Sequence, residues 1–129
     1  MQVVERAIAA VNARDVEGYL ACCTEDIELS TPISAIAGVY AGPEGIRRFF
    51  AEVQDAATDF RLDIERIESL RPDRALGFLR NSASGRASGV PINDAIETTA
   101  VYDFAGGRIR RIRIFLDRQE ALEAAALRE

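Results

Sequence analysis

A long hairpin near the end of the chain constrains the fold most strongly. It runs from Ile92 to Asp117 (INDAIETTAVYDFAGGRIRRIRIFLD), with a tight turn at Ala105-Gly106-Gly107. In its first strand every second residue belongs to a mostly apolar set, which consists of Ile96, Thr98, Ala100, Tyr102 and Phe104. In its second strand the apolar set is Ile112, Ile114 and Leu116. Because successive side chains of a strand point to opposite faces, the pattern predicts a hairpin with one apolar face and one charged face.

Helices come before this hairpin. Apolar residues at helical spacing predict an amphipathic helix that ends near residues 12–14, and Asp15 is placed to cap a second, short helix that ends near Cys23. Residues 27–31 alternate as a short strand. A third helix begins near Pro43, because proline is tolerated in the first turn of a helix.

Further strands lead into and out of the hairpin. Residues 60–64 alternate cleanly, and a slip of the pattern at Ile67 predicts a β-bulge near Glu65 and Arg66. Residues 71–74 form a turn, a strand starts at Ala75, and residues 85–91 form a loose turn. Asp117 and Glu120 match the capping box of a last helix, to about residue 127. The order predicts one α+β domain, residues 1–129, in which a strongly curved antiparallel sheet wraps around the N-terminal helices.

The composition excludes several kinds of chemistry. The chain has no histidine and no lysine, so a Ser-His-Asp triad, a histidine zinc site and Schiff-base catalysis are ruled out. Acid–base catalysis would fall to Asp, Glu, Tyr or Cys. Cys22 and Cys23 are adjacent and make poor disulfide partners. We expect neither a metal nor a cofactor.

Charge and hydropathy limit which partners and which location are expected for the protein. The net charge of −5 argues against nucleic-acid binding. The first residues carry Glu5 and Arg6 in an amphipathic pattern, so they do not resemble a signal peptide. No apolar run approaches the length of a membrane span. We expect a cytoplasmic protein that does not bind membranes.

Alternation assigns a set of side chains to the interior of the sheet. The assigned residues are Leu29, Thr31, Leu76, Phe78, Arg80, Ser82, Ile96, Thr98, Ala100, Tyr102, Phe104, Ile112, Ile114 and Leu116. Among them Arg80, Thr98, Tyr102 and Thr31 are the polar candidates. Thr98 and Tyr102 could donate to a ligand oxygen or could be satisfied core hydroxyls, and Thr31 would line a pocket.

Arg80 is the most informative of these candidates. An arginine on an apolar face needs acceptors or water, because an unpaired buried charge is costly. It could hold a carboxylate or polarise a carbonyl of a ligand. Alternatively it forms a structural ion pair with Asp55, Asp59, Asp94 or a glutamate, or its charged end reaches out to water.

The other face of the hairpin is charged. Glu97, Thr99, Asp103, Arg111 and Arg113 lie there, and ion pairs between neighbouring strands are a sufficient explanation for the charges. Val101 and Phe115 share that face and are unfavourable in water, which indicates a homodimer interface on the outer face of the sheet.

Three stretches carry a resemblance to a known family. They are VVERAIAAVNARDVEGYLACCTEDIEL, YAGPEGIRRFFAEV and GGRIRRIRIFLDRQEAL. With the order of elements, they make the chain similar to the nuclear transport factor 2-like superfamily, also called SnoaL-like or ketosteroid-isomerase-like. The resemblance implies that the curved sheet is cone-shaped and forms an α+β barrel around the N-terminal helices, with an apolar pocket open at one end. It also implies homodimers that pair the outer faces of their sheets.

The catalytic residues of two branches of that family are incomplete here. Ketosteroid isomerases have an aspartate just before a proline after the first strand, where this chain has Thr31. Their oxyanion-hole residues match Ala7 and Ala100. Epoxide hydrolases of the limonene type have an arginine that matches Arg80, but their two aspartates match Ser82 and Ile114. The resemblance therefore implies the fold and a pocket more strongly than either reaction.

Three functions follow as hypotheses. The favoured one is a protein that binds a small, largely apolar molecule, with or without a carboxylate or carbonyl group. The second is an isomerase, cyclase or hydratase that uses Arg80 with a carboxylate, for which Asp94 is the candidate. The third is a dimeric interaction module with a vestigial pocket. The predicted pocket comprises Thr31, Phe78, Arg80, Ser82, Thr98, Ala100, Tyr102, Ile112 and Ile114.

Overall fold

A computed structural model describes residues 2–32, 38–56, 60–82 and 96–126 of the chain. The helices are α1 (Gln2–Asn12), α2 (Val16–Ala21), α4 (Gly42–Ala56) and α5 (Arg118–Ala126). The strands are β1 (Cys23–Ser30), β2 (Tyr40–Ala41), β3 (Arg61–Arg71), β4 (Arg74–Ser82), β5 (Ile96–Ala105) and β6 (Arg108–Phe115). The predicted turn at residues 85–91 lies outside the described residues.

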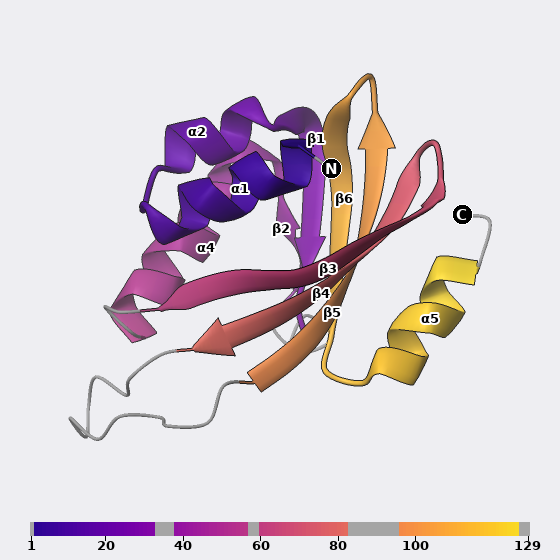
Figure 1. Cartoon of the computed structure of the whole chain (residues 1–129). Helices are drawn as coiled ribbons and strands as arrows, with labels where there is room; N and C mark the ends of the chain where they lie inside the picture. The colour runs from indigo at the N-terminus through magenta and orange to yellow at the C-terminus, as the bar shows by residue number, and fades with distance from the viewer. Residues whose placement is uncertain (1, 33–37, 57–59, 83–95, 127–129) are drawn as a thin grey trace.

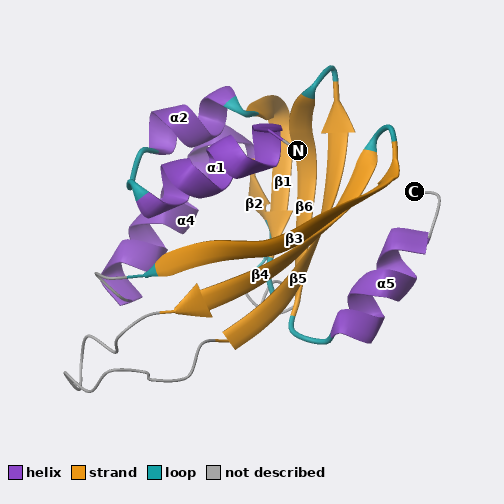
Figure 2. Cartoon of the chain, in the orientation of Figure 1, coloured by secondary structure: helices purple, strands orange, loops and turns teal. Residues whose placement is uncertain are grey.

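The six strands form one curved sheet in the order β2-β1-β6-β5-β4-β3 (Figure 1). Helices α1, α2 and α4 lie on one side of it and α5 on the other (Figure 2). We call the side that faces α1, α2 and α4 the concave face, and the α5 side the convex face. The predicted α+β class and curved sheet are confirmed. The prediction of an antiparallel sheet was wrong for one pair, because β1 and β6 run parallel.

Several local predictions are confirmed. The Asp15 side chain accepts a hydrogen bond from the Gly18 amide (3.0 Å) and caps α2, and Asp117 accepts one from the Gln119 amide (2.8 Å) at the start of α5. The register of β3 against β4 shifts between Ile64 and Arg66, where the bulge was predicted. The hairpin turn uses Gly106 and Gly107, both with positive φ, a conformation that glycine adopts without steric cost.

The main core fills the space between the concave face and the helices. Val4 and Ile8 of α1, Tyr19 of α2 and Ile46 of α4 are buried against it. From the sheet it includes Ile27, Leu29, Leu62, Leu79, Ala100, Tyr102, Ile109 and Ile112. The aromatic rings of α4 extend the core, since Phe50 packs edge-on against Tyr19 with ring centroids 5.3 Å apart. Both cysteines are buried here, and Cys23 begins β1 instead of ending α2.

A second, smaller core lies under α5 on the convex face. It contains Leu76, Phe78 and Val101 with Ala121 and Ala125, and Phe115 packs against it. Val101 is fully buried. Of the two apolar residues from which a dimer interface was inferred, Val101 is therefore covered by α5, and Phe115 is half-buried beside it.

Strand β4 has the opposite orientation from the one predicted. Gly77 pairs with Ala100 and Leu79 with Thr98, so the odd-numbered residues of β4 share the concave face with the even-numbered residues of β5. The bulky Leu76 and Phe78 face α5 instead. Space explains this arrangement, because a Cβ atom on residue 77 would lie 2.8 Å from Cε2 of Tyr102. Leu116, also predicted to point inward, is 62% exposed.

Asn12 at the end of α1 holds the free edge of β3. Its Nδ2 donates to the Leu62 carbonyl and its Oδ1 accepts from the Leu62 amide, each at 2.8 Å. We expect Asn12→Ala to lower the free energy of unfolding by about 1–3 kcal/mol, because the edge groups lose both partners. Urea denaturation measures this. Asn12→Asp keeps only the acceptor and should lie between wild type and alanine; equal stability of all three would contradict the account.

Candidate functional site: the concave face of the sheet

The side chains of β5 and β6 that were predicted to point inward do face the helices. Ala100, Tyr102 and Ile112 are at most 3% exposed, and Thr98 is 6% exposed. Ile114 is half-buried and packs against the same core. The middle of the concave face is thus closed by packing.

Three predicted pocket residues lie on the opposite face. Phe78 is in the core under α5, and Arg80 and Ser82 share its side of β4 by alternation. Arg80 forms ion pairs with Glu65 (3.7 Å) and with Glu97 on the neighbouring strand (3.5 Å). Its side chain is 49% exposed. The assignment of Arg80 to the concave face was therefore wrong, and the structural ion pair with a glutamate is the arrangement found.

The guanidinium groups of Arg66 and Arg118 lie over the Phe78 ring, with their Cζ atoms 4.5 and 4.7 Å from its centroid. Cation–π contacts of this kind stabilise a ring at the edge of a core. Phe78 therefore has a structural role in holding α5.

We call the end of the concave face where β4 stops and β5 begins the Asn81 end. Phe60 and Ile64 are half-buried there and pack against the main core, and so does Ile114 near the adjoining end of β6, where it pairs with Ala100. Other apolar residues that pack against this core, such as Ile67 and Phe104, are half-buried as well. Asn81 belongs to this end, because it pairs with Leu62 on one side and with residue 96 on the other. The Thr98 hydroxyl donates to Asn81 Oδ1 at 3.2 Å.

Asn81 was missed by the sequence analysis. The error in the orientation of β4 put Arg80 in its place. The signal that could have found it is Gly77, since a glycine opposite Ala100 leaves room for the large Tyr102 ring and so identifies the concave side of β4.

Thr31 lies beside this region at the end of β1. With Ser30, Ile114, Asp117 and Glu120 it lines an open hollow of about 550 Å³ between the ends of β1 and β6 and the first turn of α5. Thr31 and Ile114 are the predicted pocket residues in this hollow.

The titratable groups within the concave core are poorly suited to proton transfer. Burial raises the pKa of Tyr102 and of Tyr19 above the ordinary value for tyrosine. Burial, and then the neighbouring Cys22, raise the pKa of the Cys23 thiol to about 12. These groups stay neutral near pH 7, and Cys23 is not a thiolate nucleophile.

The strand residues that face the concave side carry no carboxylate in the described ranges, since the concave positions of β3, β4, β5 and β6 contain no Asp or Glu. From the helices, Glu52 reaches this core, where it accepts a hydrogen bond from the Tyr40 hydroxyl. Asp94, the predicted catalytic candidate, lies outside these ranges.

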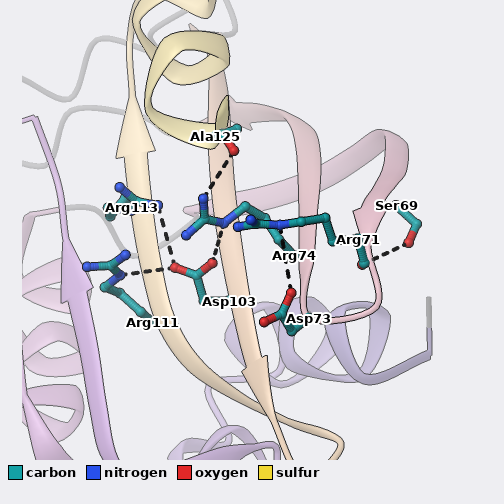
Figure 3. A network of polar contacts seen from close by, with 8 residues as sticks. All are labelled: Ser69, Arg71, Asp73, Arg74, Asp103, Arg111, Arg113 and Ala125. Atoms are coloured by element: carbon teal, nitrogen blue, oxygen red, sulfur yellow. Dashed lines mark hydrogen bonds and ion pairs between the residues drawn. The ribbon is translucent and has the colours of Figure 1, made fainter. Parts of the chain in front are cut away.

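A charged network occupies the convex face instead (Figure 3). Asp103 accepts from Arg74 (2.5 Å) and Arg111 (3.0 Å), and Arg113 lies 3.5 Å away. This confirms the predicted ion pairs of Asp103 with Arg111 and Arg113. Arg74 is 1% exposed and also donates to the Ala125 carbonyl (3.1 Å), so the network ties α5 to the sheet.

Solved structures with the same fold cover nearly the whole chain. An NTF2-like protein of unknown function from Burkholderia pseudomallei is 19% identical, with a TM-score of 0.78 over 98% of this chain and 97% of its own. TerC, co-crystallised with polyporic acid, is 20% identical, with a TM-score of 0.78 over 96% and 95%. Rv0760c from Mycobacterium tuberculosis, in complex with estradiol-17beta-hemisuccinate, is 18% identical, with a TM-score of 0.73 over 91% and 92%.

Sequence comparison gives the family. No curated protein sequence matches the chain. None of the helices in the described ranges is long and apolar enough to cross a lipid bilayer. The profile of the SnoaL-like domain matches residues 4–112. Since this match spans most of the chain and the fold agrees with it, the protein belongs to the SnoaL-like family of the NTF2-like superfamily.

Proposed function

We propose that the protein binds a small, largely apolar molecule at the Asn81 end of the concave face. One observation carries the proposal. Apolar side chains are tightly packed in the middle of this face, whereas Phe60 and Ile64 at the Asn81 end keep part of their surface accessible, as does Ile114 next to Ala100. Partly exposed apolar groups gathered in a concave region are typical of ligand sites.

Two structures of the same fold support this proposal. TerC was crystallised with polyporic acid, and Rv0760c with estradiol-17beta-hemisuccinate. Their low sequence identity limits the inference to the shared architecture, which can accommodate a small ring compound.

Binding is favoured over acid–base catalysis. The described concave positions of β3, β4, β5 and β6 contain no carboxylate, and Arg80, which was to assist one, is held on the convex face. A catalytic function would need a general acid or base within hydrogen-bond reach of the ligand.

Equilibrium dialysis with 2-ethylnaphthalene tests the proposal. We expect saturable binding of one molecule per chain. Ile64→Asn should weaken this binding about tenfold, because an apolar contact with the ligand is replaced by a polar group. The matched control is Leu70→Asn, since Leu70 is on the same strand but is 44% exposed at its far end, next to α5.

Arg80→Ala serves as a second control and should leave binding unchanged. If uptake does not saturate, or if Leu70→Asn weakens it as much as Ile64→Asn, the concave site is refuted. If every variant stays folded and none binds, the pocket is vestigial.

A further inference from the structure

A second hollow lies on the convex face, between the end of β3 and α5, and the sheet separates it from the proposed ligand site (Figure 2). Its volume is about 350 Å³, which falls within the range of roughly 300–1,000 Å³ that small-molecule sites occupy. The described residues that line it are aliphatic except for one arginine, and none is acidic; they are Leu70, Arg71, Leu76, Leu122, Ala125 and Ala126. The lining is therefore apolar with a single cation.

Two consecutive residues of β3 reach this hollow because the strand is irregular there. The register of β3 against β4 shifts between Ser69 and Arg71. In a regular strand, neighbouring side chains point to opposite faces, whereas a bulge interrupts this alternation. Leu70 and Arg71 can therefore both line the hollow, which brings an aliphatic and a charged side chain together.

The aliphatic surface of the hollow is only partly covered. Leu76 is 1% exposed, whereas Leu70 is 44% and Leu122 is 40% exposed. Leu70 and Leu122 come from elements that are distant in sequence, β3 and α5, and face the same hollow. An aliphatic chain lying between them would remove apolar surface from water on both sides, which is favourable.

Arg71 supplies the cation at this surface. Its Nε lies 3.8 Å from Oδ1 of Asp73, too far for a hydrogen bond, and is buried without a hydrogen-bond partner among the described residues. Asp73 is 71% exposed, so water screens this ion pair. The neighbouring Arg74, by contrast, donates to Asp103 and to the Ala125 carbonyl. Since a guanidinium has five N–H donors and the Arg71 side chain is 40% exposed, Arg71 has donors left for an anionic ligand.

From this arrangement we infer that the hollow between β3 and α5 is a second ligand site, which binds a small aliphatic carboxylate. The chain of the ligand packs on Leu70, Leu76 and Leu122, and its carboxylate accepts hydrogen bonds from Arg71. Hydrogen bonds between a guanidinium and a carboxylate are charge-assisted and stronger than neutral ones, so the charge of the ligand contributes to its selection. The inference does not depend on the proposed function, because that site lies on the opposite side of the sheet.

Three probes with linear chains of the same length test the inference: octanoate, 1-octanol and octylamine. Near neutral pH they carry a negative charge, no charge and a positive charge. The readout is a methyl-resolved NMR titration that follows Leu70 and Leu122. We expect saturable shifts with octanoate, and an affinity about tenfold higher than that for 1-octanol, as one charge-assisted hydrogen bond allows. Octylamine should bind least, because Arg71 repels its charge.

A substitution of Arg71 tests the role of the charge. Arg71→Gln should abolish the preference for octanoate while leaving the affinity for 1-octanol within about twofold. The matched control is Arg80→Gln on the same face, which should change none of the affinities, because Glu65 and Glu97 hold Arg80 outside the hollow.

A substitution of Leu70 tests the aliphatic wall independently. Leu70→Asn should weaken octanoate and 1-octanol about tenfold each, because a polar group replaces an apolar contact. Ile64→Asn, on the same strand but on the concave face, is the control and should leave the octanoate titration at Leu122 unchanged. These two variants are expected to have the reverse effects on 2-ethylnaphthalene, so the two sites are distinguished by the same proteins.

The outcomes separate this inference from the proposed function. If octanoate causes no saturable shift at Leu70 and Leu122, if 1-octanol binds there equally well, or if Arg71→Gln keeps the preference, the inference is overturned. Octanoate shifts confined to Ile64 and Ile114 would overturn the second site and leave the proposed function intact. Octanoate binding at Leu122 without any binding of 2-ethylnaphthalene would remove the proposed function and support this inference.

Discussion

Asp103→Asn should lower the free energy of unfolding by roughly 3–5 kcal/mol, the range found when one partner of a buried ion pair is removed. Arg74 is 1% exposed and would lose its carboxylate while remaining buried. Arg111 would lose a hydrogen bond of 3.0 Å to the same group. Urea denaturation followed by circular dichroism gives the value.

The matched control is Asp73→Asn in the neighbouring turn. Asp73 pairs with Arg71 at 3.8 Å, and its side chain is 71% exposed, so this substitution should change stability by less than about 1 kcal/mol. Equal effects of the two substitutions would contradict the assignment of Asp103 as the centre of a buried network.

The effect of Asp103→Asn should also depend on pH. Burial by itself would raise the pKa of Asp103, but hydrogen bonds from Arg74 and Arg111 outweigh it and lower the pKa below the usual value. A carboxyl group whose pKa is lower in the folded state contributes its full stability above the unfolded pKa, about 4, and loses it as the pH falls through the folded pKa. The stability difference between wild type and Asp103→Asn should therefore shrink below about pH 4. If the stability difference between the two proteins grew at acid pH, its pH dependence would be opposite to this prediction and would refute the network.

Tyr102→Ala should cost about 3–5 kcal/mol, as the truncation of a buried aromatic side chain does. The ring is 3% exposed, lies over Gly77 and stacks on Phe104 with centroids 6.4 Å apart. Its removal leaves a cavity in the middle of the concave face that the surrounding strands cannot close. Thermal or urea unfolding measures the loss.

Tyr102→Phe separates the ring from its hydroxyl. This variant loses at most the hydrogen bond of the hydroxyl, so its free energy of unfolding should remain within about 1.5 kcal/mol of wild type. It should also bind 2-ethylnaphthalene normally, because the proposed site is at the Asn81 end. If Tyr102→Phe lost affinity for 2-ethylnaphthalene while remaining folded, Tyr102 would be a ligand contact, as one of the sequence hypotheses held.

Local features of the chain could be predicted because they depend on a few neighbouring residues. The glycine turn of the hairpin, the caps at Asp15 and Asp117, and the bulge after Ile64 each follow from the chemistry of a short segment. The family resemblance also gave the curved sheet correctly, since its motifs extend along the chain and mark architecture.

The orientation of β4 could not be obtained from alternation. In the run Ala75-Leu76-Gly77-Phe78-Leu79 both faces are apolar, so either face could be assigned to the main core. The second core under α5 needs the larger residues, and the Tyr102 ring needs a glycine opposite Ala100. Both requirements come from elements distant in sequence.

The same dependence limited prediction of the site. Thr98, Ala100, Tyr102, Ile112 and Ile114 were placed correctly on the concave side because β5 and β6 have one clearly apolar face. Asn81 could be recognised only from the register of β4 against β5. The burial of Val101 under α5 could not be predicted either, because nothing in its own strand shows that α5 covers it.

A methyl-resolved NMR titration with 2-ethylnaphthalene tests the proposed binding site most directly. The account predicts saturable shifts of the methyl groups of Ile64 and Ile114 at the Asn81 end of the concave face. The methyl groups of Leu76, Val101 and Leu122 around α5 should remain unchanged. Shifts confined to that second group, or no saturable shifts at Ile64 and Ile114, would contradict the account.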